Sequence, residues 1–120
     1  MIIGFEEYTH ELTDLELKYV VPTIIPILED AEGPKNAVSA AMLIKHIEHL
    51  TGYSTHDSRI RQAIHHLRIT ETIRNLCANG KGYFIAQKKE KVETYLLSLS
   101  QRVNSIEEMK RAVRYSSTFV

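Results

Sequence analysis

The segment Asn-Gly-Lys-Gly at residues 79–82 constrains the fold of this chain more than any other short stretch. It lies between two strand-like runs, residues 73–78 and 83–87. Asn-Gly is a strong hairpin signal, because a tight turn between antiparallel strands needs residues that tolerate positive φ. The sequence therefore predicts a two-stranded hairpin with Lys81 at its tip.

The glycines on either side of Lys81 do not form a phosphate-binding loop. A Walker-type loop needs G-x-x-x-x-G-K-[ST] between a strand and a helix, whereas here Gly-Lys is followed by Gly-Tyr and a second strand. A dinucleotide fingerprint needs a third glycine and a following helix. We therefore expect no nucleotide cofactor and interpret Lys81 as a cation at the hairpin tip.

A capping box marks the start of the first predicted helix, which spans residues 13–33. The Thr13 hydroxyl and the Glu16 carboxylate would each satisfy a backbone N–H group at the helix start. Pro22 and Pro26 interrupt the apolar stripe that follows. Because each proline removes a backbone donor, we expect a kink near Pro22 or two shorter helices.

Two shorter helices are predicted next, at about residues 40–51 and 56–68, after a short extended piece at 36–38. Ser39 is suited to cap the first of them, and Gly52 is suited to end it. The order over residues 36–87 is thus extended piece, helix, turn, helix and hairpin. This order predicts a helix-turn-helix followed by a two-stranded wing.

The helix at residues 56–68 has the composition of a recognition helix, with aliphatic residues on one face and hydrogen-bonding residues on the other. Arginine pairs bidentately with guanine and glutamine with adenine, so we expect Arg59, Gln62 and His65 to face the groove. A lysine at the wing tip would meet phosphate or the minor groove. The predicted DNA-contacting residues are Thr55, His56, Ser58, Arg59, Arg61, Gln62, His65, His66 and Lys81.

Charge is segregated along a chain whose formal net charge is zero. Residues 1–33 carry eight acidic side chains and one basic one, and residues 53–91 carry eight basic and three acidic ones. The basic stretch favours a polyanionic partner. Zero net charge favours the alternative, a protein–protein interaction module without DNA binding, because non-specific DNA affinity grows with the number of neutralised phosphates. Arg61 and Arg68 have a second interpretation, as internal ion-pair partners of acids in the first helix.

The last segment, residues 88–114, predicts a long C-terminal helix. Its apolar residues repeat at spacings of four and three, which is a heptad-like pattern. A second capping box at residues 105–108 leaves open a break near residue 104. A helix of about 26 residues is about 39 Å long, more than a small core covers. We therefore predict a homodimer, with Leu99, Val103, Ile106 and Met109 as the dimerisation residues.

Residues 36–111 resemble the small winged-helix DNA-binding domains, especially those of phages and mobile elements. The resemblance is carried by RIRQAIHHLR at 59–68, LCANGKGYFIA at 76–86 and VETYLLSLSQRV at 92–103. The matching residues are Arg61, Ile64, Leu67, Arg68, Gly82, Tyr83, Leu96, Ser98, Leu99 and Arg102. Such proteins often have a glycine between the recognition helix and the wing, where this chain has Ile-Thr-Glu-Thr at 69–72.

The pattern and the resemblance together imply a mainly α fold of the α+β type. It is a winged helix-turn-helix with a two-stranded wing and a long C-terminal helix, in one domain over residues 1–120. The implied partner is double-stranded DNA, and the implied roles are transcription regulation or phage-type replication.

Catalytic and metal-binding patterns are not expected in this chain. No Ser-His-Asp or Cys-His spacing stands out, and zinc needs three or four convergent ligands that the histidines at 46, 49, 65 and 66 do not suggest. We expect no enzyme, no metal and no cofactor. No apolar run approaches the roughly 20 residues of a membrane span. With a single cysteine as well, the sequence predicts a cytoplasmic protein without a membrane partner.

Overall fold

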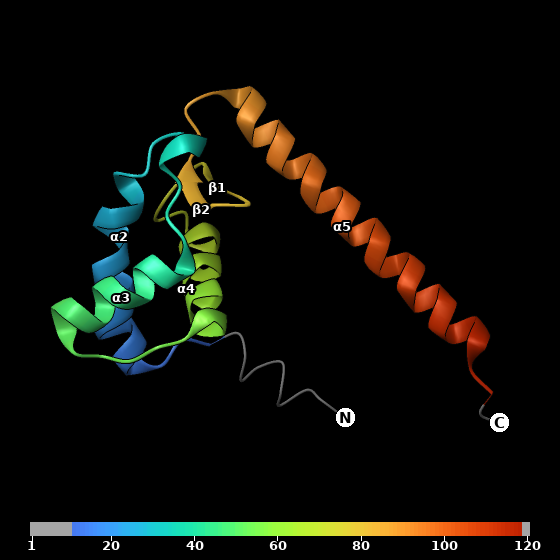
Figure 1. The fold of residues 1–120 in the computed structure, drawn as a ribbon, viewed down its shortest axis with the longest axis horizontal. Coiled ribbons are helices and arrows are strands. Elements are labelled where there is room, and N and C mark those ends of the chain that lie inside the picture. The colour runs from blue at the N-terminus through green and yellow to red at the C-terminus, as the bar shows by residue number, and fades with distance from the viewer. Residues whose placement is uncertain (1–10, 119–120) are drawn as a thin grey trace. The chain divides into compact units, whose positions relative to one another are not determined.

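The computed structural model describes residues 11–118. These residues form two units, and the chain passes from the first to the second between Gln87 and Lys88. The first unit is mainly helical and contains a two-stranded antiparallel sheet, and the second is one long helix (Figure 1). The sequence predicted a single domain over residues 1–120 in which the C-terminal helix begins at residue 88, and the boundary between the two units lies at this position.

The first helix of the first unit is widened just before Pro22. η1 (Glu16–Val20) is a π-helical stretch, and α2 (Val21–Glu29) continues from it as an α-helix. In a regular helix the proline ring would crowd the carbonyl group four residues earlier. The π-helical stretch avoids this arrangement, and the Val21 N–H donates to the Glu16 carbonyl instead. The irregularity predicted near Pro22 is therefore a π-bulge.

α3 (Ala40–Thr51) and α4 (Asp57–Ile69) follow after the short 3-10 helix η2 (Pro34–Asn36). The predicted Ser39 cap is confirmed, since its hydroxyl accepts a hydrogen bond of 3.2 Å from the Met42 N–H. Gly52 ends α3 with a φ of 74°. The apolar faces of α2, α3 and α4 meet in one core, which contains Ile24, Leu28, Leu43, Ile47, Ile60, Ala63, Ile64 and Leu67.

The predicted hairpin is confirmed. β1 (Leu76–Asn79) pairs antiparallel with β2 (Gly82–Ile85), with Asn79 opposite Gly82 and Lys81 in the two-residue loop. The physical reason for the turn differs from the expected one. The Asn79 side-chain carbonyl accepts hydrogen bonds of 2.8 and 3.2 Å from the N–H groups of Lys81 and Gly82. The positive φ falls at Gly82, not within the Asn-Gly pair.

The segment before α3 holds the outer edge of the hairpin. Val38 and Tyr83 exchange two backbone hydrogen bonds of 2.8 Å, so Val38 extends the sheet by one residue. A Cβ atom on Gly82 would lie only 2.1 Å from the Val38 carbonyl oxygen. Glycine at position 82 is therefore required by this close approach of two backbone segments.

The second unit consists of α5 (Lys89–Ser116), a helix of 28 residues. At 1.5 Å per residue it is about 42 Å long. The helix is continuous, so the alternative of a break near residue 104 is wrong. None of its residues is buried.

Candidate nucleic-acid interface

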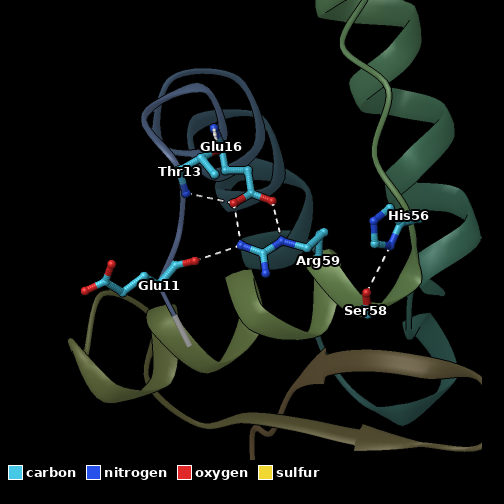
Figure 2. A network of polar contacts seen from close by, with 6 residues as sticks. All are labelled: Glu11, Thr13, Glu16, His56, Ser58 and Arg59. Carbon is cyan, nitrogen blue, oxygen red and sulfur yellow. Dashed lines mark hydrogen bonds and ion pairs between the residues drawn. The ribbon is translucent and has the colours of Figure 1, made fainter. Parts of the chain in front are cut away.

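α4 presents a polar face on the side opposite its buried face. Ser58, Arg61 and His65 are exposed, and Gln62 is half-buried beside them. At about 100° per residue these four positions fall within roughly a third of the helix circumference. Ser58 lies at the start of this face, with its hydroxyl 2.9 Å from His56 Nδ1 (Figure 2). The residues expected in the groove therefore form one surface, with the exception of Arg59.

Arg59 turns away from this surface towards η1, as Figure 2 shows. Its Nε donates to Glu16 Oε2 at 2.7 Å, and its Nη2 donates to Glu16 Oε1 at 2.6 Å and to the Glu11 carbonyl at 2.8 Å. The Arg59 side chain is 18% exposed and the Glu16 side chain is 4% exposed. The prediction that Arg59 faces a DNA groove is therefore wrong, because position 59 lies on the flank of α4 that faces the first helix.

The predicted capping box of Thr13 and Glu16 is confirmed, and it orients the Glu16 carboxylate that pairs with Arg59. The Thr13 N–H donates to Glu16 Oε1 at 2.8 Å, and the Glu16 N–H donates to Thr13 Oγ1 at 3.1 Å. The hydrogen bonds from Arg59 are the main cause that lowers the pKa of Glu16, the Thr13 N–H lowers this pKa further, and burial opposes both. Glu16 therefore stays ionised and neutralises Arg59.

The other two arginines of α4 have different contacts from Arg59, and Arg61 pairs within its own helix instead of with an acid of the first helix. Arg61 lies 3.8 Å from Asp57 of its own helix, and both side chains are about two-thirds exposed. An exposed pair of this kind contributes little, so Arg61 can exchange Asp57 for another anion. Arg68 donates from Nε to the Leu76 carbonyl at 3.0 Å and so links α4 to β1. Only Arg61 of the three arginines in α4 is an exposed cation.

Two polar atoms near the exposed face have no hydrogen-bond partner within residues 11–118. They are the buried Oε1 of Gln62 and the buried Oγ1 of Thr55, which lies in the turn between α3 and α4. A buried polar atom without a partner costs free energy. His56 is exposed on the same turn, and His66 is half-buried on α4.

Lys81 is exposed at the tip of the hairpin. β1 and β2 lie at the C-terminal end of α4 (Figure 1). The hairpin is held there by the hydrogen bond from Arg68 to the Leu76 carbonyl and by the pairing of β2 with Val38. The lysine is thus carried on an anchored element.

The predicted dimerisation residues lie on α5. Val103, Ile106 and Met109 are exposed, and Leu99 is half-buried. They belong to an apolar stripe along the helix, which Lys110 interrupts near its C-terminal end. This stripe is a second candidate surface, separate in the chain from the polar face of α4.

Comparisons of the chain with protein-family models, with curated proteins and with solved structures found no match. Within residues 11–118, none of the helices has the length and apolar character needed to span a membrane. In the same part of the chain, no three His, Cys, Asp or Glu side chains are grouped in a way that could hold a metal ion. A function is therefore proposed from the geometry of α4, the hairpin and α5.

Proposed function

We propose that the first unit is a winged helix-turn-helix that binds double-stranded DNA. α3, residues 52–56 and α4 supply the helix-turn-helix, and β1 with β2 supplies the wing. The observation that carries the proposal is the division of α4 into a buried aliphatic face and a polar face, on which Arg61 is exposed and Gln62 is half-buried. A recognition helix needs this division, because it must be anchored on one side and read base edges on the other.

In this proposal the residues of α4 and of the wing have three different roles. Arg61 and Gln62 contact base edges in the major groove, where arginine selects guanine and glutamine selects adenine. Lys81 at the wing tip contacts phosphate, which adds affinity without sequence selectivity. Arg59 is a positioning residue, because its ion pair with Glu16 fixes the start of α4 against η1.

We also propose that the chain binds DNA as a homodimer. One α4 and one hairpin offer few exposed cations, and the chain has a formal net charge of zero. Binding of a single unit would neutralise few phosphates and be weak at physiological salt. Two copies on one duplex double these contacts, as expected for a protein of transcription regulation or phage-type replication.

The proposal is tested by fluorescence anisotropy with duplexes selected from a random pool, at two salt concentrations. We expect Arg61→Ala to cost roughly 1–3 kcal/mol on the selected site and to relax its preference at one position. Lys81→Ala should weaken binding to all duplexes about equally and lower the salt slope by about one. Lys18→Ala, an exposed lysine of η1, is the matched control and should bind like the parent. A parent protein that binds no duplex at low salt would refute DNA binding.

A further inference from the structure

We infer that α5 pairs with the α5 of a second copy as a two-stranded parallel coiled coil. The inference rests on the proposed homodimer and goes beyond it by assigning the orientation and register of the two helices. Together these decide whether both copies present α4 at the same end of the assembly.

The apolar stripe of α5 has the heptad pattern of a coiled-coil seam. In heptad positions a to g, position d is occupied by Val92, Leu99, Ile106 and Val113, and position a by Leu96, Val103 and Lys110. The exposed fractions are 53% for Leu96, 57% for Val103, 49% for Ile106 and 64% for Val113. A contiguous apolar stripe of this length seldom remains exposed in a soluble monomer. The stripe therefore requires a partner helix.

Charge complementarity identifies that partner as a second copy of this helix. Arg102 occupies position g and Glu107 occupies position e of the next heptad. In a parallel coiled coil, the side chain at g faces the e residue five positions further on in the other helix. Arg102 of each copy therefore meets Glu107 of the other, which gives two equivalent ion pairs across a two-fold axis.

Lys110 favours the parallel orientation. In a parallel pair in register, the two Lys110 side chains share one layer, and their aliphatic stems pack while the ammonium groups reach solvent. In an antiparallel pair centred on Val103 and Ile106, each Lys110 would lie against Leu99 of the other copy, which would disrupt two layers. A polar residue at one position a within an apolar seam also fixes the register. Between Val92 and Val113, the parallel pair keeps all the remaining layers apolar.

Parallel pairing has a consequence for DNA binding. Each first unit is joined to the N-terminal end of α5 at Lys88. Two parallel helices therefore attach both first units to the same end of the coiled coil. An antiparallel pair would attach them to opposite ends of a helix about 42 Å long. The parallel pair therefore attaches two recognition helices to one end of the coiled coil, from which both can contact the same duplex.

The orientation is tested by cross-linking the full-length Val113→Cys variant. In the parallel pair the two introduced cysteines lie in one d layer, and mild oxidation should give a covalent dimer on a non-reducing gel. In the antiparallel pair they would be about 25 Å apart along the axis, beyond the reach of a disulfide. Glu108→Cys on the outer face and the parent, whose Cys77 is buried, are the controls. A dimeric Val113→Cys protein that does not cross-link would overturn the parallel orientation.

The register and the dimer itself are tested by sedimentation equilibrium at micromolar concentration. Arg102→Glu should raise the dimer dissociation constant about fivefold, and Arg102→Glu with Glu107→Arg should restore the parent value. The double variant Val103→Glu with Ile106→Glu should be a folded monomer. The control is Gln101→Glu with Asn104→Glu, which has the same spacing on the outer face of the helix and should remain a dimer. A monomeric parent would overturn the inference. A cross-linked dimer that binds no duplex would refute only DNA binding and would support the coiled coil.

Discussion

α4 and α5 are both amphipathic helices, but they use their apolar faces differently. Four of the five aliphatic residues of α4, at positions 60, 63, 64 and 67, are almost completely buried in the first unit, whereas Ile69 at its end is exposed. α5 repeats aliphatic residues just as regularly and buries none of them. The comparison shows that the periodicity of a helix predicts its apolar stripe. Which element covers the stripe depends on residues elsewhere in the chain or in another chain.

The charged residues of the two helices differ in the same way. Arg59 of α4 forms two short hydrogen bonds to the buried carboxylate of Glu16. On α5, Lys89 and Glu93 are 3.9 Å apart and both are exposed. An exposed pair contributes little because water and salt screen it. Loss of one partner from a buried pair is costly, since the remaining charge stays desolvated.

The largest expected effect tests the difference between the two apolar faces. Ile64→Ala should lower the free energy of unfolding of the first unit by about 2–5 kcal/mol, because it leaves a cavity among residues that cannot collapse fully. Val103→Ala on α5 should change this free energy by less than about 0.5 kcal/mol. Urea unfolding followed by near-ultraviolet circular dichroism of the tyrosines measures both. Equal losses for the two variants would contradict the conclusion that α4, and not α5, belongs to the core of the first unit.

The next effect tests the difference between the two ion pairs. Glu16→Gln should destabilise the first unit by about 3 kcal/mol, because the largely buried Arg59 loses its counter-charge. Glu93→Gln is the matched control on α5 and should leave the unfolding midpoint unchanged. If Glu16→Gln were as stable as the parent, Arg59 would be solvated and the ion pair would not fix α4.

The same pair predicts how stability depends on pH. The pKa of Glu16 is lower in the folded protein than its ordinary value of 4.5, chiefly through the hydrogen bonds from Arg59. The contribution of the pair is therefore fully present above pH 4.5 and is lost as the pH falls through the lowered folded pKa. The difference in unfolding free energy between the parent and Glu16→Gln should shrink in that acidic range. A difference that stays constant down to pH 2 would contradict the assignment.

The smallest effect concerns the end of α4, where a glycine is often found in the resembling winged-helix domains. Glu71 has a φ of 54°, and the N–H groups of Glu71 and Thr72 donate to the carbonyls of Arg68 and Leu67. This is the left-handed end of a Schellman motif, which favours glycine. Glu71→Gly should raise the free energy of unfolding by roughly 0.5–1 kcal/mol, measured by urea unfolding. Glu71→Ala removes the charge but keeps the strained φ, and an equal gain for it would assign the effect to charge.

Most local features of the first unit could be predicted from the sequence. The capping box at Thr13, the Ser39 cap and the hairpin around Lys81 each depend on residues within a few positions of one another. The aliphatic face of α4 was also predicted, because helical periodicity is itself local. The pairing of Val38 with Tyr83 was not predicted, since one extended residue carries no periodic signal and its partner is 45 residues away.

The sequence by itself determined where the helices and the hairpin form, because caps, turns and periodicity act over a few residues. Only the tertiary structure decided which arginine of α4 is an exposed cation. Arg59 and Arg61 are two residues apart and chemically identical, so their local sequence does not distinguish their roles. The packing of η1 against α4 brings Glu16, 43 residues away in sequence, to the Arg59 guanidinium. A buried carboxylate binds the arginine that it faces, and Arg61 is left to solvent on the polar face.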